Sequence, residues 1–198
     1  MRTRKAPEER KAEIITAAAS LINQHGYKKV AMIDVANAID VSKAALYVYF
    51  PTKDALFEAV VFQSLEAPLA AIKSASKTQV DTTVKLTSML VESFSLALYK
   101  PKPMIELINS SRGYAQNILK DHTQQSLDLY TAVLNNAQKQ GEITLPSQYL
   151  NTEDAAKLIL SSAHGAALGT NIGSPILPQK QMQTRITALI HSLIKGWS

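Results

Sequence analysis

The sequence predicts an all-α protein of about nine helices: a three-helix N-terminal unit followed by a larger helical domain. Two observations carry this prediction. Apolar residues recur at intervals of three and four along most of the 198-residue chain, which is the spacing of one helix face. In addition, Gly26 to Lys53 contains two short helical patterns separated by a single break. Boundaries are expected at residues 1–52 for the first domain and 53–198 for the second.

The chain opens with a basic arm. Residues 1–11 contain five Lys or Arg and two Glu, so they hold +3 of the net charge of +5. A solvated tail would have the same composition. Beside a nucleic-acid-binding unit, however, such an arm lies along phosphates or enters a minor groove.

The first helix is predicted from about Pro7 to Gln24. Its apolar stripe repeats at i, i+4, i+7 and i+8 and consists of Ile14, Ala18, Leu21 and Ile22. This stripe should cover the next two helices, and Gly26 should end the first helix as a C-cap.

The second and third helices are predicted on either side of Asp40. Met32, Val35, Ala36 and Ile39 share one helix face before this break. Asp tolerates a left-handed backbone better than a β-branched residue does, although Gly would be better still.

Ser42 is then predicted to be the N-cap of the third helix, accepting the amide hydrogen of Ala44 or Ala45. Pro51 should end that helix.

Spacing divides the third helix into two faces. Leu46 and Phe50 are four residues apart and should point into a small core, whereas Lys43 and Tyr47 share the opposite face. Exposed tyrosines are unusual on so short a helix, and half-buried packing remains the alternative for Tyr47 and Tyr49.

The run V-S-K-A-A-L-Y-V-Y-F followed by P-T-K-D-A-L resembles the signature of the tetracycline-repressor (TetR) family of transcription regulators, V-S-K-G-T-L-Y-x-Y-F-x-S-K-E-x-L. The resemblance covers about the first 60 residues. It extends upstream through Ala17, Ala18, Leu21, the Gly26-Tyr27 pair, Asp34-Val35-Ala36 and Ala38. It implies a dimer that binds a palindromic DNA operator, with two recognition helices spaced for successive turns of the duplex.

This resemblance also implies the residues of the DNA interface. Lys53 matches the family's phosphate-contacting lysine, and Tyr49 would donate its hydroxyl to a phosphate. The full set is Arg4, Lys5, Met32, Ile33, Lys43, Ala44, Ala45, Tyr47, Val48, Tyr49 and Lys53.

Three departures from the family pattern alter this expectation. Val30 and Ala31 replace hydroxyl residues that cap the second helix and contact a phosphate. Ala44-Ala45 replaces Gly-Thr, leaving methyl groups that can meet a thymine methyl but cannot form hydrogen bonds with a base. Ile33 stands where many members carry a polar base-reading side chain. Lys43 is therefore the best direct reader, with guanine O6 and N7 as its target.

The fourth helix should begin near Lys53, and Pro68 should kink or end it. Five more helices are expected from about Gln79 onward. One of these should run from Tyr114 to Gln140 and be closed by Gly141, and Asn151 or Thr152 should cap the next.

The last two helices are the predicted dimer interface. Small residues are dense between Ala155 and Gly169, which favours close approach of helices, and a broad apolar stripe follows. The interface candidates are Ala156, Ala163, Ala167, Ile186, Leu189, Ile190 and Leu193. An intrachain helical hairpin is the alternative.

The resemblance further implies a pocket for a small, largely apolar effector. Its candidates are the larger or polar groups on inward faces, each of which could equally be plain core: Phe62, Met89, Phe94, Met104, Ile108, Tyr114, Ile118, His122, His164 and Leu168. The four histidines lack metal-ligand spacing, so no metal is expected, and no cofactor is expected either.

Composition narrows the function class. The chain has no cysteine, which excludes disulfides and thiol catalysis and suits a reducing cytoplasm. We expect neither a signal peptide nor a membrane span. Because catalytic sequence motifs are absent, we expect no enzyme. Two interpretations remain: a repressor released by a small effector, or a dimeric DNA-binding adaptor without one.

Overall fold

The computed structural model describes residues 6–110, 115–146, 148–168 and 177–197, and within these ranges it contains nine α-helices and no strand. The all-α prediction is confirmed. The helices in chain order are α1 (Pro7–His25), α2 (Met32–Ala38), α3 (Lys43–Tyr49), α4 (Lys53–Ser76), α5 (Thr82–Leu98), α6 (Lys102–Ser110), α7 (Gln116–Lys139), α8 (Thr152–Leu168) and α9 (Gln179–Gly196).

The chain forms two compact units. The first contains residues 1–66 and 100–120, and the second contains residues 67–99 and 121–198. This division differs from the boundary expected at residue 53, because the first half of α4 and all of α6 pack with the N-terminal helices. Each unit has its own apolar core.

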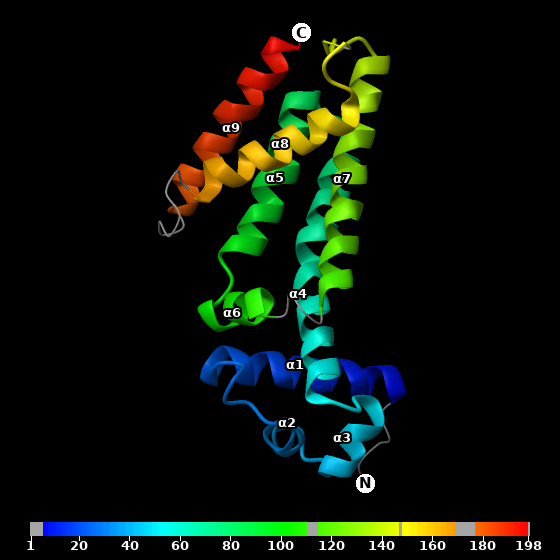
Figure 1. The fold of residues 1–198 in the computed structure, drawn as a ribbon, viewed down its shortest axis with the longest axis vertical. Helices are drawn as coiled ribbons and strands as arrows, with labels where there is room; N and C mark the ends of the chain where they lie inside the picture. Colours follow the sequence, from blue (N-terminus) through cyan, green and yellow to red (C-terminus); the bar gives the residue numbers. More distant parts are fainter. Residues whose placement is uncertain (1–5, 111–114, 147, 169–176, 198) are drawn as a thin grey trace. The chain divides into compact units, whose positions relative to one another are not determined.

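The core of the first unit forms around α1. Ile14, Ala18 and Ile22 are buried along one side of this helix, as their spacing predicts, and α2 and α6 both pack against it (Figure 1). Met104 and Leu107 of α6 enter the same core. The three-helix unit expected from sequence is therefore completed by a helix from a later part of the chain, beyond α4 and α5.

Local backbone geometry sets the turn between α2 and α3. Asp40 has a φ of 53°, so the predicted left-handed residue is confirmed. Ser42 caps α3, since the Ala45 backbone N–H donates to its Oγ at 3.1 Å. Gly26 ends α1 with a φ of 82°, and its N–H donates to the Ile22 carbonyl at 2.8 Å.

Helix α4 begins at Lys53 as predicted, with the Ala55 N–H donating to Thr52 Oγ1 at 3.0 Å. Pro68 lies inside α4 and does not end it. Of the described helices, α4 alone is long and apolar enough to cross a membrane, with a mean hydropathy of 1.4 over its most apolar stretch. Its buried residues Leu56, Phe57, Val60 and Val61 belong to the core of the first unit.

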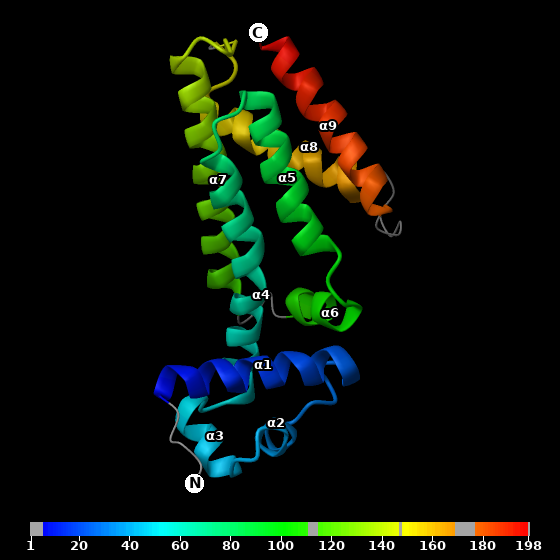
Figure 2. The same cartoon turned by 180° about the vertical axis from the view of Figure 1, so that it is seen from behind.

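The second unit is built on α5, α7, α8 and α9. Figures 1 and 2 show α8 crossing α5, with α9 on one side of the pair, and α9 packs against both α8 and α5. Asp81 caps α5 by accepting the Val84 N–H at 3.0 Å. Asn151 caps α8 by accepting the Asp154 N–H at 2.8 Å. Gly141, with a φ of 75°, follows α7, which ends at Lys139.

The cap of α3 can be tested by substitution. Ser42→Ala should lower the free energy of unfolding by about 1 kcal/mol, because the Ala45 N–H loses its acceptor. Ser42→Asn should retain most of the stability, since Asn is as good an N-cap. Urea unfolding followed by circular dichroism measures both. An equal loss in the two variants would show that the cap hydrogen bond is not the cause.

Candidate nucleic-acid interface

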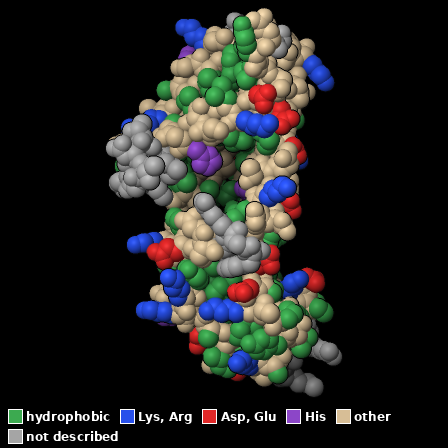
Figure 3. Space-filling model, viewed as in Figure 1, with side chains coloured by type: hydrophobic (Ala, Val, Ile, Leu, Met, Phe, Trp, Pro, Cys, Tyr) green, Lys and Arg blue, Asp and Glu red, His purple; other side chains and the backbone are tan. Residues whose placement is uncertain are grey.

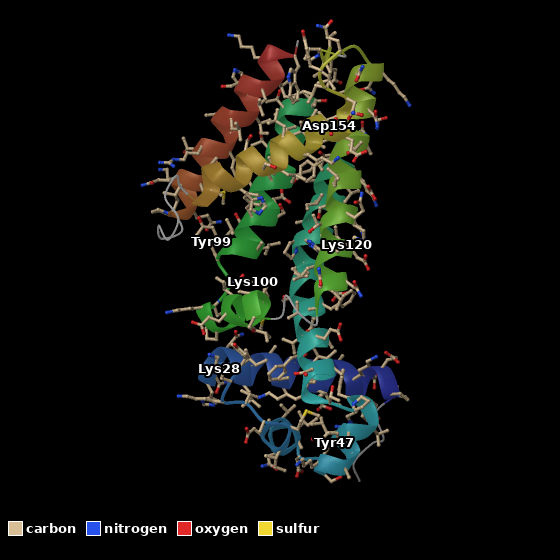
Figure 4. All side chains as sticks on the ribbon, in the orientation of Figure 1. Lys28, Tyr47, Tyr99, Lys100, Lys120 and Asp154 are labelled. Carbon is tan, nitrogen blue, oxygen red and sulfur yellow. The ribbon has the colours of Figure 1, made fainter. Side chains whose placement is uncertain are left out.

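Helix α3 presents one face to the core and the other to solvent. Leu46 and Phe50 are buried, as predicted. Tyr47 is 40% exposed and Val48 is 80% exposed, and Figure 4 shows Tyr47 on α3. Tyr49 is half-buried and packs against the core of the first unit. A seven-residue helix with this arrangement can place a reading face in a major groove while its other face remains anchored.

Two lysines on this surface lie over aromatic rings. Lys43 Nζ is 5.8 Å from the centroid of the Tyr47 ring, and Lys53 Nζ is 4.9 Å from the centroid of the Phe57 ring. Neither forms an ion pair with another described residue. The rings restrict where each ammonium can lie without neutralising its charge. Both cations therefore remain available to a phosphate or a base edge.

At the start of α2, one of the two residues predicted to contact DNA is exposed and the other is buried. Ile33 is 42% exposed, so it can reach a partner. Met32 is 5% exposed and belongs to the core, so its assignment to the DNA interface is corrected. The Ala31 N–H donates to Asp34 Oδ2 at 2.8 Å. The Asp34 carboxylate therefore satisfies the N–H of the N-cap residue, which is one half of a capping box, whereas the hydroxyl half is missing because Val30 and Ala31 cannot provide it.

Exposed apolar side chains mark this end of the first unit. Figure 3 shows them gathered over α2 and α3, with Lys and Arg side chains nearby. Ile33, Tyr47 and Val48 are the large exposed hydrophobic residues of these helices. Ala44 is exposed and Ala45 is half-buried. This surface offers methyl groups and ring edges with few hydrogen-bonding groups, in agreement with the sequence.

Sequence reasoning gave no role to Lys28 and Lys29. Both side chains are exposed in the link between α1 and α2 (Figure 4 labels Lys28), and Lys28 Nζ is 6.0 Å from the Tyr27 ring centroid. The sequence signal that could have indicated a phosphate contact is the pair of adjacent lysines shortly before the start of α2. Arg4 and Lys5 of the basic arm lie outside the described residues.

The family of the chain follows from comparison with known proteins. Residues 14–60 match the model described as "Bacterial regulatory proteins, tetR family", a range that spans most of α1, all of α2 and α3 and the start of α4. Residues 14–60 thus form a tetR-family domain. The matched residues contain the helix-turn-helix formed by α2 and α3.

Curated relatives match the chain over part of its length. Nucleoid occlusion factor SlmA of Glaesserella parasuis is 30% identical over 118 residues, which cover 59% of this chain and 58% of that protein. The chain thus spans little more than half the length of that relative. The HTH-type transcriptional regulator UidR of Escherichia coli is 25% identical over 158 residues, 78% of each chain.

Solved structures share the fold over nearly the whole length. A TetR-family regulator from Mesorhizobium loti has a TM-score of 0.73 at 17% identity and covers 98% of this chain and 100% of its own. Salmonella enterica GusR has a TM-score of 0.70 at 19% identity and covers 98% of each chain. These neighbours confirm the helical architecture of the chain.

The residues predicted for an effector pocket are divided between the two units. Phe62, Met104, Ile108 and Ile118 belong to the first unit, whereas Met89, Phe94, His122 and His164 belong to the second. Tyr114 lies outside the described residues, as does the side chain of Leu168.

Phe62 is exposed rather than inward-facing, so its expected orientation is corrected. It lines a surface groove of about 590 Å³ together with Ile118 and residues of α1. Met104 is part of the core beneath α1. In the second unit, Phe94 and His164 form an edge-to-face ring pair with centroids 4.8 Å apart.

A buried hydroxyl stands out in the core of the second unit. Tyr130 is fully buried, and its hydroxyl has no well-formed hydrogen bond to any described residue, although the Ser93 side chain is beside it. Burial raises the pKa of this phenol, so it stays protonated and can donate a hydrogen bond. Ser93 Oγ instead donates to the Leu90 carbonyl at 3.1 Å.

Some of the residues predicted for the dimer interface are buried, and others are accessible. Ala156, Ala163, Ala167, Ile186 and Ile190 are buried in the core of their own protomer, so their assignment to a surface is corrected. Their small or branched side chains serve packing between helices within the second unit. Leu189 and Leu193 are half-buried and remain accessible. Among the described residues there is no cluster of three or more His, Asp or Glu that could hold a metal.

The different positions of Met32 and Ile33 give a direct test. Met32→Ala should lower the free energy of unfolding by about 2–4 kcal/mol, because it leaves a cavity in a small core. Ile33→Ala should change it by less than about 1 kcal/mol, since the side chain is largely solvated. Chemical denaturation of both variants checks this, and a larger loss for Ile33→Ala would contradict the assigned faces of α2.

Proposed function

We propose that the chain is a transcriptional repressor that binds a palindromic operator as a homodimer and is released by a small, largely apolar molecule. The DNA-binding part of this proposal rests on the two faces of α3. Leu46 and Phe50 hold one side of the helix in the core, and the exposed residues on the other side are Lys43, Tyr47 and Val48. Family membership supports the repressor role, the dimer and the response to a ligand.

The composition of the surface suggests how operator reading is divided. Lys43 is the one charged side chain on the exposed face of α3, so guanine recognition would depend on it. Ala44, Val48 and Ile33 offer apolar contact, which suits thymine methyl groups and DNA shape. Lys53, together with Lys28 and Lys29, would supply phosphate contacts that set affinity and register without reading sequence.

Binding to a duplex selected from a random-sequence library tests this division. Lys53→Ala should weaken binding to selected and unrelated duplexes alike and reduce the slope of log K against log[salt] by about 1, as expected for one lost phosphate contact. Tyr47→Ala should lower affinity for the selected duplex more than for an unrelated one. Band-shift titrations over a series of salt concentrations measure both effects.

Lys139→Ala provides a matched control, because this lysine lies in the last turn of α7 in the second unit and should affect neither titration. Unchanged affinity in both Tyr47→Ala and Lys53→Ala would contradict the assignment of α3 and the start of α4 to the DNA interface.

The dimer surface that we propose is the solvent-facing side of α8 and α9. Leu158 and Gly165 of α8 are exposed and share a face at i and i+7. Leu189 and Leu193 of α9 are half-buried at i and i+4. A glycine on this face permits close approach of a partner helix, and the leucines supply apolar area. This revises the set expected from sequence while keeping the same two helices.

Leu158→Lys should convert the dimer to a monomer, because it places a charge in the apolar part of the interface. Leu96→Lys is the matched control, since this leucine of α5 is exposed to a similar extent and lies outside the proposed surface. Sedimentation equilibrium measures the molecular mass of each variant. Loss of the dimer in both variants, or in the control alone, would contradict the proposed surface.

An effector-free adaptor is the second candidate. The similarity over 118 residues to a protein named as a nucleoid occlusion factor favours a role other than transcription regulation. The similarity to the transcriptional regulator UidR covers more of the chain at lower identity. Substrates of enzymes encoded beside the gene can be tested for release of the selected duplex in a band shift. Release supports the effector, and retention with all of them supports the adaptor. Either role places the protein in the cytoplasm with the DNA.

A further inference from the structure

Pro68 creates a defect inside α4. Proline has no backbone N–H, so the carbonyl four residues earlier, that of Ser64, loses its normal donor, and the proline ring also crowds this carbonyl. The helix nevertheless continues to Ser76. The Ser64 hydroxyl does not compensate, since it donates to the Val61 carbonyl at 2.7 Å. The Ser64 carbonyl can therefore accept a hydrogen bond from a donor outside the helix.

The donor is Lys100. Its Nζ donates to the Ser64 carbonyl oxygen at 2.7 Å, across 36 positions of sequence. Lys100 lies between the end of α5 at Leu98 and the start of α6 at Lys102, as Figure 4 shows. Both residues of this hydrogen bond belong to the first unit.

The placement of Lys100 is unusual for a lysine. The side chain is half-buried and forms no ion pair with another described residue. Loss of solvent lowers its pKa, so the site disfavours the charge that it contains. A charge-assisted hydrogen bond to a carbonyl that lacks its usual helix donor offsets this cost. A long, flexible side chain suits the task, because it can reach the helix from a neighbouring segment.

The consequence concerns α6. This helix begins two residues after Lys100 and contributes Met104 and Leu107 to the core beneath α1. We infer that Lys100 takes the place of the missing Pro68 N–H and thereby positions α6 in the first unit. It is a positioning residue for the DNA-binding unit. This inference goes beyond the proposed function and does not depend on DNA binding.

A double-mutant cycle between Lys100 and Pro68 tests the inference in the full chain. Lys100→Met should lower the midpoint of thermal unfolding by about 3–6 °C in the native background. In a Pro68→Ala background, the substituted alanine restores a backbone N–H for the Ser64 carbonyl, so the same change should lower the midpoint by less than about 2 °C. Equal losses in the two backgrounds would overturn the inference.

Two further variants separate this role from a general structural one. Lys100→Arg retains charged donors and should stay within about 2 °C of the native midpoint, and a loss as large as that of Lys100→Met would count against the inference. Lys102→Met is the matched control at a neighbouring exposed lysine and should shift the midpoint by less than about 1 °C. If Lys100→Met alone fails to fold, recovery of folding in the double variant supports the inference, and no recovery overturns it.

Hydrogen exchange tests the effect on α6 directly. In Lys100→Met, the amides of residues 105–108 should exchange faster, while those in the middle of α9 should be unchanged. Unchanged exchange in α6 would show that Lys100 does not position this helix, whatever the outcome of the thermal cycle.

Discussion

Burial of one face of α3 is the constraint on which the proposed DNA-binding surface depends. Helices α2 and α3 contain seven residues each, and isolated helices of that length are unstable in water. They persist because Val35, Ala36, Leu46 and Phe50 are held in the core of the first unit. That fixed face determines which residues point outward, so the reading surface is a product of packing in the core that α1 and α4 share.

The core that fixes this face is assembled from distant parts of the chain. Helix α6 packs on α1 although the HTH helices and α4 and α5 intervene in sequence. Its apolar residues add core contacts that a free-standing three-helix domain would not have. Any change at α6 therefore has a physical route to α1, through Met104 and Leu107, and so to the recognition helix packed in the same core.

The second unit shows how burial limits inference about interfaces. A broad apolar stripe on α9 and dense small residues on α8 are expected of an intersubunit bundle, but they are equally required for packing within one protomer. Packing within one protomer fully buries Ile186 and Ile190 of α9 and Ala156 and Ala163 of α8. What remains outside is a narrower surface with Gly165 and three leucines of intermediate or high exposure.

The sequence by itself determined the local features: the left-handed Asp40, the Ser42 cap, the glycine ends of α1 and α7, and the two faces of α3. These depend on backbone preferences and on spacing along one helix, which are set by neighbouring residues. Only the tertiary structure decided that Phe62 faces solvent, that α6 belongs with α1, and that Lys100 serves the Ser64 carbonyl. Those outcomes depend on contacts between residues far apart in the chain, and periodicity within one helix contains no information about which element will cover it.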